Sequence, residues 1–226
     1  MRIGHLQDAL ALVHQLKATL LDSRAFHGYS GPMRAVSGTI ALVAAAVMWS
    51  DFFPDTKPAY AMGWGAVFLV AFVLNGAAVG YWFLHDKGVK RDPNRLRPIV
   101  DVIPPMAVGA LLTGVAIYRG DPGYLYGIWM CMFGLTNLAS RYVLPWPIGL
   151  VGVFYVICGT LVLLLGMPFL NPWPMGVVFF LGEWASGAIL YMDRRRYAAF
   201  AAYVDRLNET APEKGQMGDV SDDTDQ

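Results

Sequence analysis

The sequence predicts an all-α, polytopic membrane protein with six transmembrane helices and an N-terminal cytoplasmic amphipathic helix. The first observation is composition: of 226 residues, 56% are hydrophobic and 15% are charged, whereas a soluble domain carries about a quarter charged residues. The second is distribution, because the charges gather in short clusters separated by apolar stretches. These stretches are continuous and do not alternate in polarity, which indicates helices and not the strands of a membrane barrel.

Six apolar stretches are long enough, or nearly so, to cross a bilayer. A helix needs roughly 20 mostly apolar residues to cross a hydrocarbon core of about 30 Å. The stretches cover residues 34–53, 60–84, 98–118, 124–143, 147–167 and 175–193. The last two are joined by the Pro-rich sequence MPFLNPWP, and we expect them to form a helical hairpin.

The basic residues predict the orientation. If the N-terminus is cytoplasmic, fifteen of the 17 Lys and Arg residues lie on the cytoplasmic side, and only Lys57 and Arg119 lie outside. Cytoplasmic loops of membrane proteins carry an excess of Lys and Arg. We therefore expect a multi-pass protein of the bacterial inner membrane with both termini in the cytoplasm.

The regions outside the spans (34–193) divide into three segments. Residues 1–33 contain an amphipathic helix at 3–21, whose apolar stripe could lie in the membrane interface, pack on a protein or self-associate; its balanced charge favours packing against protein. Residues 194–208 continue an amphipathic pattern after the sixth span and predict a cytoplasmic helical extension. Residues 209–226 are acidic and lack aromatic residues, which predicts a disordered tail.

Glu183 lies within the sixth span, in the sequence FFLGEWASGAIL. It precedes Arg194 by eleven residues, so it lies roughly 16 Å from that cytoplasmic boundary, near the bilayer midplane. An ionisable group there costs several kcal/mol in lipid, so the side chain should face the bundle and be protonated or paired. It is either a proton-titrating or ligand-coordinating site, or a protonated carboxyl that holds a neighbouring helix. The second interpretation is favoured.

Asn75 is expected at a similar depth in the second span, where Gly76 and Gly80 follow it with GxxxG spacing. Such spacing lets two helix backbones approach closely. Helix packing is the favoured interpretation, and the sharper hypothesis makes Asn75 the hydrogen-bond partner of Glu183.

Asp101 opens the third span and is followed by Pro104 and Pro105. A proline inside a helix cannot donate to the carbonyl four residues back, so the pair predicts a kink or break. Broken helices line substrate and ion sites in some transporters. A structural kink, with Asp101 reaching Arg97 in the basic loop, is favoured over that alternative.

Asn137 and Arg141 lie four residues apart near the end of the fourth span and share a helix face. Arg141 is expected to extend to the cytoplasmic surface. The alternative is that it holds a lipid phosphate or an acidic residue of another helix.

No set of catalytic or metal-ligating residues is visible in the sequence. It contains no HExxH, Walker, GxSxG or CxxC motif. Cys131 and Cys158 lie inside predicted spans, where free thiols packed as small apolar groups are expected. The sequence thus predicts no enzyme, no cofactor, no metal site and no nucleic-acid partner.

Two stretches carry a resemblance: LLDSRAFHGYSGPMRAVSGTIALVAA (20–45) and GLTNLASRY (134–142). They resemble sequences of a loosely defined group of uncharacterised bacterial six-helix integral membrane proteins. The matching positions are Arg24, Gly31, Gly38, Asn137, Ser140, Arg141 and Tyr142. Members often carry a histidine in the last helix, where this chain has GEWASG. The group has no established activity, so the resemblance implies the six-helix topology and no function.

The favoured function is a non-enzymatic sensory, regulatory or structural module that contacts a cytoplasmic regulatory protein or another copy of the chain. The two amphipathic cytoplasmic segments motivate it. The alternative is a small proton-coupled transporter that uses Glu183, Asn75 and Asp101, and it requires a water-accessible cavity at Glu183. A lipid-acting enzyme ranks third and needs a polar pocket around Asp101, Arg97 and Arg141.

Overall fold

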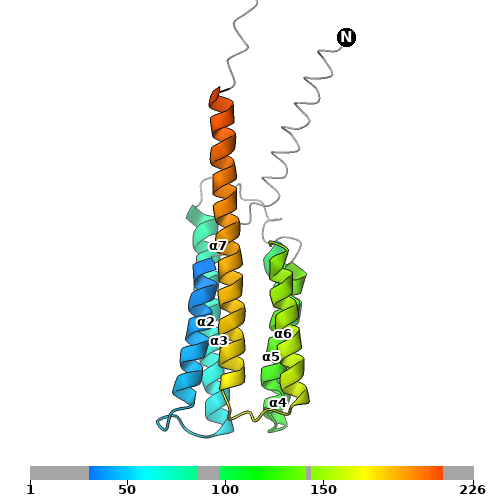
Figure 1. Ribbon diagram of the computed structural model, residues 1–226. Coiled ribbons are helices and arrows are strands. Elements are labelled where there is room, and N and C mark those ends of the chain that lie inside the picture. Colours follow the sequence, from blue (N-terminus) through cyan, green and yellow to red (C-terminus); the bar gives the residue numbers. More distant parts are fainter. Residues whose placement is uncertain (1–30, 86–96, 141–143, 211–226) are drawn as a thin grey trace, which may run out of the picture. The chain divides into compact units, whose positions relative to one another are not determined.

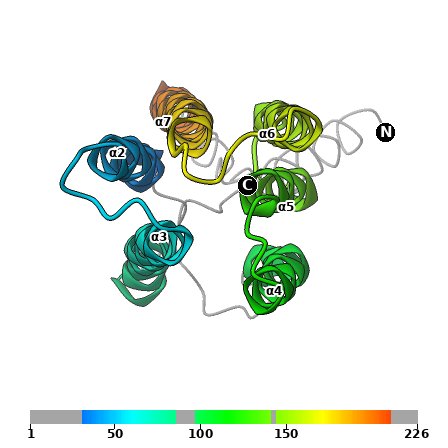
Figure 2. The same cartoon turned by 90° about the horizontal axis from the view of Figure 1, so that it is seen from below.

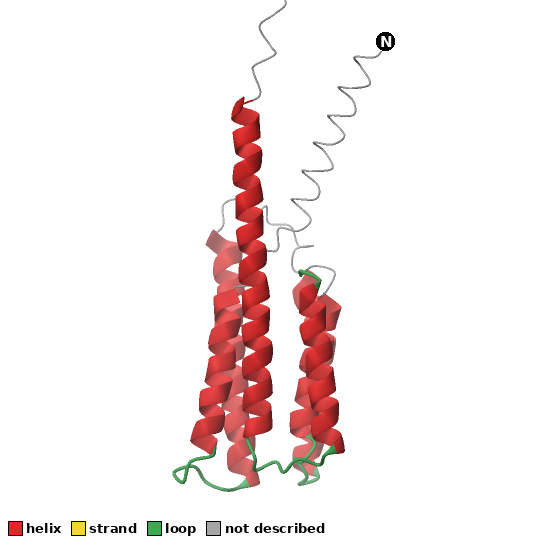
Figure 3. Ribbon diagram, viewed as in Figure 1, coloured by secondary structure: helices red, strands yellow, loops and turns green. Residues whose placement is uncertain are grey.

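The computed structural model describes residues 31–85, 97–140 and 144–210, and these residues form helices joined by short loops. The helices are α2 (Gly31–Met48), α3 (Lys57–His85), α4 (Arg97–Tyr118), α5 (Leu125–Ala139), α6 (Pro147–Leu164) and α7 (Trp173–Thr210) (Figures 1 and 3). The expected amphipathic helix at 3–21 and the tail from residue 211 onward lie outside the described residues.

Five of these helices are long and apolar enough to cross a membrane. They are α2, α3, α4, α6 and α7. The remaining helix, α5, is apolar but has 15 residues, a length of about 22 Å. It covers only part of the fourth predicted span, and residues 141–143 after it are not described. The structure therefore supports a multi-pass helical membrane protein with five candidate spanning helices.

The chain divides into two compact units, one ending at Tyr191 and one beginning at Met192. α7 contributes to both, because it is one uninterrupted helix, and residues 194–208 lie within it. Within the first unit, successive helices run in opposite directions (Figure 1). Seen along their axes, they follow one another around the unit in the order α2, α7, α6, α5, α4, α3 (Figure 2). α2 and α7, the first and last of the described helices, are thus neighbours.

Close helix packing uses glycines on two pairs of helices. On α5 and α6, a Cβ added at Gly134 would lie 2.7 Å from the carbonyl oxygen of Gly152, and one at Gly159 would lie 2.7 Å from that of Gly127. On α2 and α7, a Cβ at Gly31 would lie 2.6 Å from the Gly187 carbonyl oxygen. Only glycine permits backbones to approach so closely.

The GxxxG pair of α3 does not work in this way. A Cβ added at Gly76 or Gly80 would meet no atom within 4 Å among the described residues. The interpretation of this pair as a helix-packing motif is therefore wrong for the described part of the chain. The reason is position: α3 packs on α2 through other residues, and only 6% of its span is buried.

A kink or a break was expected in α4, and its helix continues through Pro104 and Pro105, so there is no break; the kink stays a prediction. Membrane helices tolerate proline where neighbouring groups satisfy the freed carbonyls. The Arg97 side chain is outside the described residues, so its expected contact with Asp101 stays a prediction.

The helical hairpin expected of the fifth and sixth spans is present as α6 and α7, joined by residues 165–172. This connection is held at Phe169, whose carbonyl accepts a hydrogen bond of 2.6 Å from the Tyr126 hydroxyl on α5. The Trp64 indole of α3 donates to the same hydroxyl at 3.0 Å. The buried side chains of Trp64 and Tyr126 thus join α3, α5 and the connection between α6 and α7.

Candidate functional site

The candidate site begins with the contact between α2 and α7. Gly31 lies against Gly187, and a Cβ added at Gly38 would lie 2.9 Å from the Cβ of Glu183. Arg34 falls between the two glycines on the same face of α2, since the spacing is three and four residues. The close approach of the two backbones therefore carries the Arg34 side chain to Glu183.

Arg34 and Glu183 form a buried, two-pronged ion pair. The Nε atom of Arg34 donates to Oε2 of Glu183 at 2.8 Å, and its Nη2 atom donates to Oε1 at 2.7 Å. The side chains are only 6% and 7% exposed. Such charge-assisted, bidentate pairs are roughly twice as strong as hydrogen bonds between neutral groups, and they fix geometry as well.

Two further helices complete the arrangement. Asn137 of α5 accepts a hydrogen bond of 3.0 Å from Arg34 Nη2 through its Oδ1 atom, and Tyr155 of α6 donates one of 3.1 Å to Oε1 of Glu183. We call Arg34, Asn137, Tyr155 and Glu183 the Arg34 network. It takes one residue from each of α2, α5, α6 and α7.

Glycine packing also positions the two neutral members. α5 and α6 approach closely where Gly134 meets Gly152, and Asn137 and Tyr155 each lie one turn from that contact, on its two sides. The amide of Asn137 is oriented by its own donor bond of 2.9 Å to the Phe133 carbonyl, which leaves its oxygen for Arg34.

The donors around Glu183 fit an ionised carboxylate. All three hydrogen bonds that it makes in the network are accepted from N–H or O–H groups, and the guanidinium of Arg34 is a donor only. The sequence-based preference for a protonated carboxyl is therefore corrected: Glu183 is paired. A charge near the centre of an apolar bundle is tolerated because an opposite charge lies beside it.

Aromatic rings pack at the same level. The Phe133 and Phe179 ring centroids are 4.7 Å apart, and those of Tyr155 and Phe179 are 5.2 Å apart. Glu183 itself is 5% exposed. The low polarity of this environment strengthens the attraction inside the network and raises the cost of removing either charge.

Asn75 is not the partner of Glu183, so this hypothesis is wrong. Its amide donates instead to the Ser37 hydroxyl at 2.9 Å and to the Ala71 carbonyl at 2.8 Å. α3 lies next to α2, and Ser37 is one turn beyond Arg34, so Asn75 meets α2 before it can reach α7. It joins α3 to α2 beside the network.

The other two predicted site residues lie elsewhere. Asp101 is on α4, which contributes nothing to the Arg34 network, and Arg141 is outside the described residues. Of the five candidate polar residues, the structure brings Glu183 and Asn137 together, because Arg34 donates hydrogen bonds to both.

Arg34 and Tyr155 were missed. Arg34 was counted among the cations that precede the first span, but α2 begins at Gly31 and Arg34 is 5% exposed. One sequence signal could have indicated the ion pair: the first apolar helix contains a cation, Arg34, and the last contains a carboxylate, Glu183. Tyr155 carries no such signal, because tyrosine is common in membrane helices.

Two smaller points concern thiols and hydroxyls. Cys131 and Cys158 are free, partly buried thiols. Ser186 is fully buried on α7, and its hydroxyl has no partner among the described residues. Within that same part of the chain, no group of three His, Cys, Asp or Glu could hold a metal ion.

No protein-family model matches the chain, and neither a curated protein nor a solved structure matches it. The resemblance noted from the sequence therefore identifies no family. The protein is a helical, multi-pass membrane protein by helix length and hydropathy.

Proposed function

We propose that this protein is a non-enzymatic membrane module that acts through protein contacts outside the bilayer, with the Arg34 network fixing the arrangement of its helices. In this proposal α5 makes a sixth, short crossing, and both termini lie in the cytoplasm of a bacterial inner membrane. The cytoplasmic partner is a regulatory protein or another copy of the chain.

The observation that carries the proposal is the place of the ion pair in the chain. Arg34 lies in the first turn of α2, directly after residues 1–30, and Glu183 lies on α7, the helix that continues to Thr210. The two segments expected to bind partners are therefore attached to the two helices that the pair joins. A change in the ion pair would therefore move the helix ends to which residues 1–30 and the extension of α7 are attached.

The network is suited to fixing one arrangement. Moving α7 along α2 by a single residue, about 1.5 Å, would stretch two hydrogen bonds of 2.7 and 2.8 Å. Both charges would then be partly unpaired in an apolar medium, at a cost of several kcal/mol. The pair thus favours one register between the first and last described helices.

The proton-coupled transporter is the second candidate, because an ionisable residue in a membrane helix often marks an ion or proton path. The geometry favours it less. Glu183 is buried and paired with Arg34, Asn75 binds Ser37, and the three residues invoked for transport do not form one site. The third candidate, an enzyme acting on lipid, requires a pocket around Asp101, Arg97 and Arg141, and the side chains of Arg97 and Arg141 lie outside the described residues.

The proposal is tested by photo-crosslinking in bacterial membranes, with a photoreactive residue at Tyr203 on the helical extension. Deleting residues 1–22, or making Glu183→Ala, is expected to abolish or weaken the crosslinked product, and the charge swap Arg34→Glu with Glu183→Arg to restore part of it. Tyr118→Phe, at a residue 92% exposed, serves as the control. The proposal would be refuted if the deletion of residues 1–22 and Glu183→Ala both left the amount of crosslinked product unchanged.

A parallel measurement separates the transporter. Purified protein is reconstituted into vesicles that contain a pH-sensitive dye, and a proton gradient is applied. Our proposal expects no flux that depends on Glu183. Proton flux that is present in the natural protein and lost in Glu183→Gln would establish the transporter instead.

A further inference from the structure

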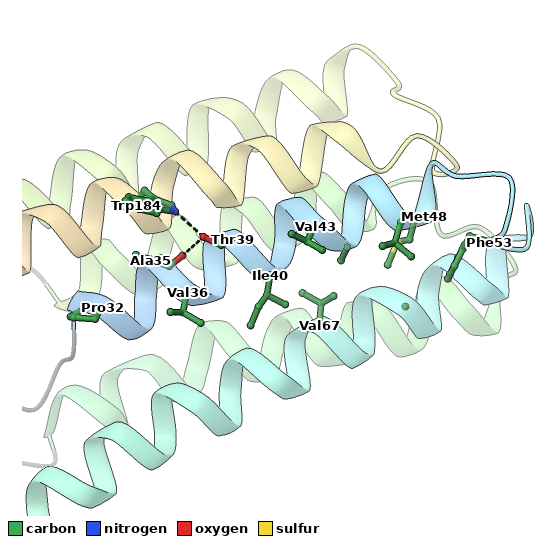
Figure 4. Close-up of a pocket in the computed structure, with 13 residues that line it drawn as sticks. Pro32, Ala35, Val36, Thr39, Ile40, Val43, Met48, Phe53, Val67 and Trp184 are labelled. Atoms are coloured by element: carbon green, nitrogen blue, oxygen red, sulfur yellow. Dashed lines mark hydrogen bonds between the residues drawn. The ribbon is translucent and has the colours of Figure 1, made fainter.

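A groove of about 630 Å³ runs along α2, between it and α3, with Trp184 of α7 at one edge (Figure 4). Its lining is almost entirely apolar and includes Pro32, Thr39, Val43, Ala44, Met48 and Trp184. All of them belong to the first compact unit. None contributes to the Arg34 network, so this is a separate site.

The groove offers no charge and no free polar group to a ligand. Its lining contains one hydroxyl and one indole N–H, and these satisfy each other: Trp184 Nε1 donates to Thr39 Oγ1 at 3.0 Å. The hydroxyl in turn donates to the Ala35 carbonyl at 2.9 Å, as the dashed lines in Figure 4 show. A polar or charged occupant would lose hydrogen bonds on entering, so the complementary ligand is uncharged hydrocarbon.

The dimensions fit a single hydrocarbon chain. From Pro32 to Met48 the groove follows sixteen residues of α2, about 24 Å, so its volume of about 630 Å³ gives a mean cross-section of about 26 Å². Chains of carbon atoms in contact at about 4 Å need roughly 16 Å² each. A helix with a diameter of about 10 Å needs roughly 78 Å², about three times that section.

The two ends of the groove differ. At one end Met48 and Phe53 lie against Gly63, where the loop joins α2 to α3: a Cβ at Gly63 would lie 3.2 Å from the Phe53 ring. At the other end lies Pro32, at the start of α2. The stretch from Pro32 to Val43 measures about 16 Å, close to half of a hydrocarbon core of about 30 Å. A chain of that length that enters at Pro32 therefore ends beside Val43.

We infer that this groove binds one acyl chain of a bilayer phospholipid, with the chain lying lengthwise along α2 against Trp184 and its headgroup at the Pro32 end. In lipid there is no water to fill the groove, and an empty groove would forfeit the van der Waals contacts of its lining. Selection is by shape, since lipid tails are as apolar as the lining. Phospholipids with different headgroups and equal chains should therefore bind alike.

The test is native mass spectrometry of the full-length protein, delipidated in detergent and then incubated with vesicles of phosphatidylethanolamine or phosphatidylglycerol that carry identical chains. One retained lipid per chain is expected with either lipid. Val43→Trp, which fills the groove, is expected to lower the retained fraction at least fivefold. Val73→Trp is the matched control: both valines are 57% exposed, but Val73 does not line the groove.

A second variant, Ala44→Leu, fills the groove with a smaller change and protects the test against a failure of Val43→Trp to fold, which circular dichroism would reveal. The inference is overturned if the natural protein retains no lipid, if both groove variants retain as much as Val73→Trp, or if retention depends on the headgroup. A lipid-free dimer that Val43→Trp dissociates would show that a second copy, and not lipid, covers this surface.

Discussion

Replacing Glu183 with glutamine is expected to lower the free energy of unfolding by about 4 kcal/mol. The substitution keeps the shape of the side chain and removes its charge. Hydrogen bonds to charged groups contribute about 1.5 to 3 kcal/mol each, and the variant weakens two such bonds, of 2.7 and 2.8 Å. It also leaves Arg34, 6% exposed in its side chain, as a buried charge without a counter-ion. Breaking a buried pair in this way costs about 3 to 5 kcal/mol.

A double-mutant cycle distinguishes this effect from general damage to the core. Arg34→Gln is expected to destabilise by a similar amount, because it leaves the carboxylate unpaired. The double variant removes both charges, so it should be more stable than the sum of the single effects predicts, by about 2 to 3 kcal/mol. Reversible unfolding in mixed micelles, followed by circular dichroism, gives the free energies.

Two results would refute the reasoning. One is a loss of less than about 1 kcal/mol in Glu183→Gln, which is the range of an exposed pair. The other is strict additivity in the cycle, which would mean that the two side chains do not interact. Tyr118→Phe, at an exposed end of α4, should change stability by no more than about 0.5 kcal/mol.

Further predictions concern the residues around the pair and use the same unfolding assay. Gly38→Ala should destabilise the protein by about 1 to 3 kcal/mol, because its Cβ would lie 2.9 Å from the Cβ of Glu183. Gly76→Ala, whose Cβ would lie in open space, should be neutral or slightly stabilising. Equal effects of the two substitutions would contradict the packing of Gly38 against α7. Tyr155→Phe should cost about 1 kcal/mol, since it removes one hydrogen bond to the carboxylate, and no loss would mean that this bond contributes nothing. Asn75→Leu should cost less than Glu183→Gln, because Asn75 bonds only neutral groups; an equal cost would place Asn75 in the charged site after all.

The polar site shows where sequence-based reasoning succeeds and where it fails. Depth can be estimated for any residue of a spanning helix from its distance to the flanking charges, and this estimate identifies Glu183; Asn137 is identified by the helix face that it shares with Arg141. Partners cannot be found in this way, because depth does not say which helices are neighbours. Asn75 was matched to Glu183 by depth alone, whereas α3 lies beside α2 and its amide meets Ser37.

Arg34 illustrates a boundary error with a large consequence. The first span was expected to begin at residue 34, so the cation was assigned to the aqueous side. The helix begins three residues earlier, at a glycine that packs on Gly187, and Arg34 enters the bundle. Sequence patterns locate helix ends only to within a few residues, and here that margin separates a surface cation from half of a buried ion pair.

The amino-acid sequence was sufficient to predict a helical protein that is apolar enough to span a membrane, because helix length and hydropathy are local properties of each segment. The tertiary structure alone decided that Arg34 pairs with Glu183, that glycines of α2, α5, α6 and α7 permit close packing, and that those of the α3 GxxxG pair do not. The physical reason is that an ion pair or a glycine contact depends on which faces of two distant helices meet. That choice is made by the packing of the whole bundle, and 149 residues of chain separate the two charges.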